Sequence, residues 1–164
     1  MLYLLDSNVL IDANRDYYPV ARVPEFWSWL THLGEQGKAK IPQEIYEELI
    51  EGRDPLSCWL KDCKHRMLLG ESVNPDLVDR VIRQGYADDL TDEEIAKMGR
   101  DPFLVAHALA VPGGRCVVTT EASRPKRTRA NRHIPDVCRD LDVPWCNTFE
   151  FLRKLDFSTG WRSS

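Results

Sequence analysis

The residues of this sequence that could do chemistry are carboxylates. Asp6 follows the apolar run LYLL, Glu121 follows the β-branched run VVTT, and Asp101 begins the pattern DPFLVAHALAV. A fourth acid is expected from the segment QEIYEELIEG, in which Glu47 and Glu48 are both candidates. Carboxylates that converge without counter-charges repel one another, and some stay protonated unless a divalent cation lies among them. Donor sets made only of oxygen suit Mg²⁺ or Mn²⁺ better than zinc.

Two of these acids also have a purely structural interpretation. Asp6 could act as the N-cap of the helix that follows the first run. Asp101 followed by Pro102 is a common helix start, with Asp as the N-cap and Pro at the first helical position. Neither interpretation requires any chemistry, and the positions alone leave both open.

The choice between Glu47 and Glu48 is tested by helical periodicity. At about 100° per residue, Glu44 and Glu51 fall opposite the apolar arc of this helix, where solvated charge is expected. Glu48 falls at one boundary of the arc beside Ile45, and Glu47 falls at the other boundary. Periodicity therefore leaves two candidates and does not choose between them.

Histidine and cysteine do not form a recognisable metal motif. The five cysteines are odd in number and include no CxxC pair, which argues against a zinc finger and a disulfide framework and favours a reduced, cytosolic protein. Cys116 and Cys138 are expected in the core. The four histidines show no HExxH or paired spacing; they are His32, His65, His107 and His133.

The elements that must position the acids alternate between strands and helices. Strands are predicted in LYLLD, KAKI, RCVVTT and VPWC, and helices are predicted from Pro24, in QEIYEELIEG, over 55–69 and 75–84, from Thr91, in DPFLVAHALAV, in IPDVCRDL and in TFEFLRKL. This alternation predicts a three-layer α/β/α, Rossmann-like domain with four or five mostly parallel strands. Ligands bind at the carboxyl ends of such strands. The first turn has no glycine-rich loop, which argues against a P-loop or dinucleotide site.

Length and composition indicate one folded unit. The chain has 164 residues, of which 43% are hydrophobic, so a single domain over residues 1–157 is expected, with a frayed tail at 158–164. No apolar stretch approaches the ~20 residues that cross a bilayer, and no signal peptide is apparent, so no membrane partner is expected. The aromatic run Phe26, Trp27, Trp29 and Leu30 is expected in the core, although one tryptophan could instead contact a second copy of the chain or a protein partner.

The charge is unevenly distributed. The net charge is −4, which by itself does not indicate a nucleic-acid-binding protein. Residues 124–133, called the basic segment below, contain no acid and carry five cations: Arg124, Lys126, Arg127, Arg129 and Arg132. Such a segment could contact the phosphates of RNA, dock an acidic segment of a protein partner, or remain solvated.

Four motifs together resemble a known family. The segments MLYLLDSNVLI, IPQEIYEEL, DPFLVAHALA and VVTTE resemble the ordered motifs of PIN domains, particularly the VapC-like toxin ribonucleases, over residues 2–155. The matched positions are Asp6 with Asn8, Glu48, Asp101 and Glu121. In the family the last acid is more often Asp and can lie beyond the strand, so Asp136 competes with Glu121. The peptide SRPKRTRANRHIPDVC resembles a less-studied PIN-like branch.

This resemblance implies a function. PIN domains of this kind usually cut RNA with Mg²⁺ or Mn²⁺, leaving a 5′-phosphate and a 3′-hydroxyl. By analogy, Asp6, Glu48 and Asp101 are expected as metal ligands, while Glu121 holds a second metal or orients water. Asn8 and Thr119 are expected to hydrogen-bond around these ligands.

The leading hypothesis is therefore a cytoplasmic, metal-dependent endoribonuclease, the toxin of a toxin–antitoxin pair. RNA is the expected substrate, and a cognate antitoxin or a second copy of the chain is a candidate protein partner. The alternative is a catalytically inactive PIN-like module that binds RNA or protein. The intact set of acids favours the nuclease.

Overall fold

A parallel β-sheet forms the centre of the molecule. The structure is a computed structural model that describes residues 1–163. Its strands are β1 (Leu2–Leu5), β2 (Ala39–Lys40), β3 (Arg115–Val118) and β4 (Trp145–Cys146), in the spatial order β2-β1-β3-β4. All three strand pairs are parallel. The predicted three-layer α/β/α class is thus confirmed, with four strands in the described part of the chain.

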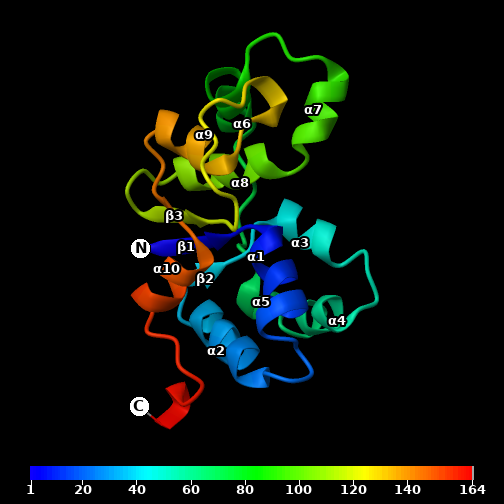
Figure 1. Ribbon diagram of the computed structural model, residues 1–164, viewed down its shortest axis with the longest axis vertical. Coiled ribbons are helices and arrows are strands. Elements are labelled where there is room, and N and C mark those ends of the chain that lie inside the picture. The colour runs from blue at the N-terminus through cyan, green and yellow to red at the C-terminus, as the bar shows by residue number, and fades with distance from the viewer. Residues whose placement is uncertain (164) are drawn as a thin grey trace.

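Helices cover the sheet from two sides. Helices α8 and α9 contact β3 and β4, whereas α2 and α5 contact β2, and Figure 1 shows these groups on opposite sides of the strands. No helix in residues 1–163 is long and apolar enough to cross a membrane. The α-helices are α1 (Ser7–Asp12), α2 (Pro24–Glu35), α3 (Gln43–Leu49), α4 (Pro55–Asp62), α5 (Lys64–Met67), α6 (Pro75–Arg80), α7 (Asp92–Met98), α8 (Asp101–Leu109), α9 (Ile134–Asp140) and α10 (Thr148–Lys154). Four shorter helical segments are η1 (Ala13–Tyr17), η2 (Val81–Tyr86), η3 (Arg129–Asn131) and η4 (Trp161–Ser163).

The two central strands bring the ends of distant segments together. Leu4, Leu5, Val117 and Val118 are fully buried, as expected for parallel strands covered on both faces. Leu5 pairs with Val118, so the residues that follow these strands lie side by side. The backbone N–H of Asp6 donates to the Val118 carbonyl at 3.0 Å. This register places the end of the first strand against the end of the third.

Two predicted helices differ in the structure. The segment 55–69 forms two helices, α4 and α5, which are separated at Cys63. Helix α5 then packs closely on α2 at Gly34, where an added Cβ would lie 2.7 Å from the Arg66 carbonyl oxygen. The apolar spacing continues through this break, so periodicity alone could not detect it. The helix predicted over 75–84 begins as α6 and continues as the π-helical segment η2.

The aromatic run of α2 lies in the core, as predicted. Phe26, Trp27, Trp29 and Leu30 are all buried. Neither Trp27 nor Trp29 is therefore available to a protein partner, and the alternative that one of them forms such a contact is wrong. Cys116 and Cys138 are also buried, as predicted.

The last described residues contact α2. The Trp161 indole N–H donates to the Glu25 carbonyl at 3.1 Å, and its ring centroid lies 5.0 Å from that of His32. Trp161, within the tail expected to be frayed, therefore packs on α2, while residues 158–160 and Arg162 are exposed. Ser164 lies outside the described residues.

Candidate active site

Asp6 is a buried carboxylate at the carboxyl end of β1. It is only 1% exposed, and its Oδ2 accepts a hydrogen bond from the Thr119 hydroxyl at 2.8 Å. Asp6 occupies the N-cap position of α1, but its side chain makes no capping hydrogen bond. Burial raises the pKa of Asp6 to about 6, and the charges of Glu121 and Glu48 also raise it, against the opposing effect of Thr119. The capping interpretation of Asp6 is therefore not supported.

Asp101 is the second carboxylate of the site. It is the first residue of α8, the N-cap is Arg100, and no side-chain capping bond is formed. Burial, followed by the charges of Asp6, Glu121 and Glu48 in that order, raises the pKa of Asp101 to about 8. Asp101 thus shares an electrostatic environment with all three of the other candidate acids.

Glu121 is held by the start of α9. Its Oε2 accepts a hydrogen bond from the backbone N–H of Ile134 at 2.7 Å, and its own N–H donates to the Thr119 hydroxyl at 3.2 Å. Thr119 therefore contacts two of the acids through one side chain. The charge of Glu121 raises the pKa of both Asp6 and Asp101.

Asp136, the competing fourth acid, has different surroundings. It is buried, its two oxygens accept hydrogen bonds from the Ser123 hydroxyl and the Arg124 N–H, both at 2.6 Å, and it pairs with Arg139 at 3.3 Å. Burial raises its pKa, but the hydrogen bonds from Ser123 and Arg124 and the charge of Arg139 lower it to a net value below normal. These contacts fix the loop after β3 on α9. The geometry therefore favours Glu121 over Asp136 as the fourth acid.

Helix α3 contributes Glu48 to this environment. Both Glu47 and Glu48 are exposed, but the charge of Glu48 acts on Asp6 and on Asp101. Glu47 instead accepts a hydrogen bond from the Gln43 amide at 2.7 Å. The structure thus favours Glu48, which periodicity alone had not separated from Glu47.

Glu44 does not face solvent, so that expectation is wrong. Its carboxylate lies 3.1 Å from Nε2 of the buried His107, and its side chain is only 14% exposed. The reason is that α8 packs against this face of α3. Buried polar groups need hydrogen-bond partners. A histidine on the apolar face of the helix was therefore the sequence signal that a polar side chain such as Glu44 must turn inward. The pair joins the helix carrying Glu48 to the helix carrying Asp101.

Asn8 is not brought to the carboxylates by any hydrogen bond. Its side chain is exposed and forms no hydrogen bond within residues 1–163. Of the two residues expected to hydrogen-bond around the acids, only Thr119 does so in this structure.

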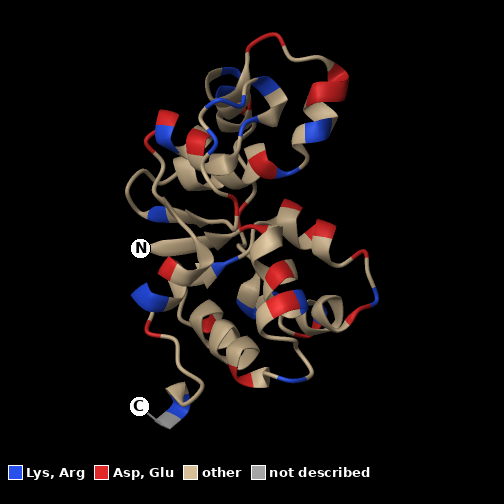
Figure 2. Ribbon diagram, viewed as in Figure 1, with Lys and Arg blue, Asp and Glu red and all other residues tan. Residues whose placement is uncertain are grey.

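The four acids Asp6, Glu48, Asp101 and Glu121 are called the acid cluster below. In Figure 2, acidic segments after β1, after β3, at the start of α8 and along α3 lie near one another. Among the described residues, none of the four forms an ion pair with Lys, Arg or His. Across residues 1–163, no group of three or more His, Cys, Asp or Glu side chains is arranged so that it could hold a metal ion. The side chains of Asp6 and Glu121 are fixed by hydrogen bonds, whereas the side chains of Glu48 and Asp101 form none with the described residues.

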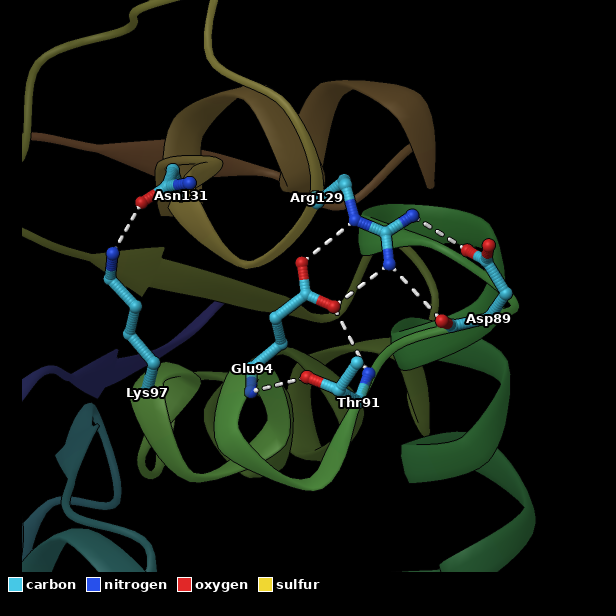
Figure 3. Close-up of polar contacts among 6 residues, drawn as sticks. All are labelled: Asp89, Thr91, Glu94, Lys97, Arg129 and Asn131. Atoms are coloured by element: carbon cyan, nitrogen blue, oxygen red, sulfur yellow. Dashed lines mark hydrogen bonds and ion pairs between the residues drawn. The ribbon is translucent and has the colours of Figure 1, made fainter.

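Two cations of the basic segment stabilise the fold. Figure 3 shows the Arg129 guanidinium between Glu94 and Asp89, with Nε 2.7 Å from Glu94 Oε1 and Nη1 2.7 Å from Asp89 Oδ1. Glu94 also completes the capping box of α7 with Thr91. Arg132 pairs with Asp140 at 2.6 Å. The prediction that all five cations serve RNA is corrected for Arg129 and Arg132, because their charges are neutralised by neighbouring acids.

The other three cations of the basic segment are exposed. Arg124, Lys126 and Arg127 form no side-chain hydrogen bond or ion pair with the described residues. They follow Glu121 by only a few residues, on the loop that Asp136 anchors. Their charges are therefore available to an anionic ligand beside the acid cluster.

Comparisons with known proteins place the chain in a family. The family model described as "Domain of unknown function (DUF4411)" matches residues 3–159, which include all of the sheet except Leu2, the acid cluster and the basic segment. No curated protein and no solved structure matches the chain. The family description names no activity, so the resemblance to PIN domains stays a hypothesis. The extent of the match shows that the chain belongs to the DUF4411 family.

Proposed function

We propose that the protein is a metal-dependent endoribonuclease. The observation that carries this proposal is the acid cluster itself. Four carboxylates from four separate segments influence one another at the carboxyl ends of β1 and β3, and burial raises the pKa of two of them. Strongly perturbed carboxylates at the strand ends of an open α/β sheet are typical of a functional site.

A divalent cation suits the chemistry of this cluster. All the donors are carboxylate oxygens, and no protein cation offsets their charge among the described residues. Asp6, Glu48 and Asp101 would hold the ion, and Glu121 would hold a second ion or orient water. The side chains of Glu48 and Asp101 have no competing hydrogen-bond partner within residues 1–163, and Thr119 keeps Asp6 in place. When bound, Mg²⁺ or Mn²⁺ supplies activation of water and neutralisation of the charge that develops on a phosphodiester.

The exposed cations support RNA as the substrate. A phosphate backbone is repelled by the acid cluster, and nearby cations offset that repulsion. Arg124, Lys126 and Arg127 provide three such charges close to Glu121. The resemblance to VapC-like toxins adds a cytoplasmic location and an antitoxin partner to this proposal.

Cleavage of a labelled single-stranded RNA by the purified protein tests the proposal. We expect cleavage with Mn²⁺ or Mg²⁺, no cleavage with excess EDTA, and products that end in a 5′-phosphate and a 3′-hydroxyl. Binding of the RNA without cleavage in either ion would instead support the inactive binding module.

Glu48→Gln is expected to reduce cleavage far more than Glu47→Gln. The charge of Glu48 acts on both Asp6 and Asp101, whereas the Glu47 carboxylate accepts a hydrogen bond from Gln43 in its own helix. Loss of one metal-ligand charge should lower kcat by about 10²-fold or more, and Glu47→Gln should change it less than about twofold. Single-turnover cleavage at saturating Mn²⁺ measures both. A larger loss in Glu47→Gln would mean that the helix register derived from the resemblance is wrong.

The exposed cations of the basic segment are expected to set the salt dependence of RNA binding. For single strands, log K falls with log salt by about 0.7 per phosphate contact, so three contacts give a slope of about −2. Changing Lys126 and Arg127 to Ala should flatten the slope by about 1.4 without lowering Tm. Fluorescence anisotropy of labelled RNA in EDTA, at several salt concentrations, gives the slope.

Arg129→Ala is the matched control for that measurement. It should lower Tm, since Arg129 joins α7 to the basic segment, and should leave the slope unchanged. An unchanged slope in the Lys126/Arg127 variant, with loss of binding to an acidic peptide, would identify a protein-docking segment instead.

A further inference from the structure

A cavity lies directly beside the acid cluster. Its volume is about 520 Å³, within the range of small-molecule sites. One wall comes from α1 and η1, a second from the loop after β3, and a third from β4 and the start of α10. Glu121 is part of the second wall, so the cavity and the acid cluster share a residue.

Two half-exposed aromatic rings line this cavity. Tyr17 is 52% exposed and Phe149 is 48% exposed, and their ring centroids lie 5.6 Å apart in an edge-to-face arrangement. Among the described residues, the other large hydrophobic side chains with this degree of exposure are aliphatic and do not line the cavity. Exposed aromatic faces beside a cavity are suited to stacking with a flat ligand.

The polar groups of the cavity favour a neutral ligand over a phosphate. Glu121 lines it without an ion pair in the described part of the chain, and its carboxylate would repel an anion. Asp12 also lines it, but its carboxylate pairs with Arg15 at 2.8 Å. The Thr148 hydroxyl, from a residue of the third wall, is buried and has no hydrogen-bond partner in the described part of the chain. A buried hydroxyl without a partner is rare in proteins.

We propose that this cavity takes one unpaired base of the RNA, stacked on Tyr17 and Phe149. The base is the uncharged, flat and polar-edged part of a nucleotide, and it matches the aromatic and acidic lining. The phosphates on either side of it would follow the exposed cations Arg124, Lys126 and Arg127, on the loop that also lines the cavity through Ser123. A paired base would have to leave the RNA duplex before it could enter the cavity, so the site selects single-stranded over duplex RNA. This inference rests on the proposed function in taking RNA as the substrate.

The test is equilibrium RNA binding without metal, so that binding is measured separately from cleavage. A fluorescein-labelled single-stranded oligoribonucleotide is titrated with the protein in EDTA and followed by anisotropy. Base–aromatic stacking corresponds to about a 5- to 150-fold change in affinity on alanine substitution, so Tyr17→Ala and Phe149→Ala should each weaken binding within that range. Phe149→Trp, which keeps a ring face, should retain affinity within about threefold. Ile95→Ala, at a 44% exposed position on α7, is the matched control and should bind as the unchanged protein does.

The outcomes distinguish this proposal from the proposed function. Weaker binding of single strands by both alanine variants, with unchanged Tm and unchanged weak binding to a duplex, supports the base site even if no cleavage is found. Normal affinity of both variants overturns the base site, and cleavage by the unchanged protein would then leave the nuclease proposal standing. Equal loss of single-stranded and duplex affinity also overturns it, because a duplex offers no unpaired base.

Discussion

Asp6→Asn and Asp101→Asn are each expected to lower the rate of RNA cleavage by about 10³-fold or more. Each change removes one carboxylate charge from the acid cluster while keeping the shape of the side chain. A bound cation contributes several kcal/mol to transition-state stabilisation. Because about 1.4 kcal/mol corresponds to a factor of ten in rate, losing about 4 kcal/mol of it slows cleavage by about 10³-fold. Single-turnover cleavage of labelled RNA in Mn²⁺ measures the loss. The RNA affinity of the metal-free variants should not decrease, since an amide repels phosphate less than a carboxylate does.

The matched control for this prediction is Asp136→Asn. Asp136 is as buried as Asp6, but it accepts hydrogen bonds from Ser123 and Arg124 rather than sharing the electrostatic environment of Asp101. This variant should lower Tm and retain cleavage below its melting temperature, whereas Glu121→Gln should lose cleavage. Full activity in Asp6→Asn or Asp101→Asn would overturn the assignment of the site. Loss of activity in Asp136→Asn at full stability would make Asp136 the fourth acid.

The elements that could be predicted from the sequence depend on local signals. β1 is an uninterrupted apolar run, and β3 is apolar after Arg115; such runs favour buried parallel strands. The capping box of Thr91 and Glu94 and the Asn74 cap are also local sequence signals, and both form in the structure. The break at Cys63 could not be predicted, because the apolar spacing is the same on both sides of it.

The candidate site was less predictable because long-range contacts decide the role of each acid. Glu121 and Asp136 both follow β3, and only the contacts of the loop with α9 separate a carboxylate near Asp101 from one that anchors the loop. Arg129 illustrates the same limit. Its partners Asp89 and Glu94 are remote in sequence. The composition of the basic segment therefore could not indicate that the charge of Arg129 is neutralised.

The metal-free protein is expected to become less stable as the pH rises from about 4 to 8. Burial raises the pKa of Asp6 from 3.8 to about 6 and that of Asp101 from 3.8 to about 8. Between the unfolded and folded pKa values, the folded protein binds more protons than the unfolded chain, so the free energy of unfolding falls with increasing pH. One pKa unit corresponds to about 1.4 kcal/mol, so the total loss should be several kcal/mol. Urea denaturation in EDTA at pH 5, 6.5 and 8 measures it.

Asp101→Asn isolates the part of this effect that belongs to the acid cluster. The variant should have a flatter pH dependence and should be more stable than the unchanged protein at pH 8, because the repulsive charge is gone. Mn²⁺ at pH 8 should raise Tm in the unchanged protein and much less in the variant, since binding to the folded state alone stabilises it. Asp136→Asn should behave oppositely and lose stability at pH 8, because hydrogen bonds and Arg139 hold the pKa of Asp136 below its usual value. If the unchanged protein and Asp101→Asn show parallel curves in EDTA, Asp101 does not share the charge of the cluster, and the proposed metal site loses its basis.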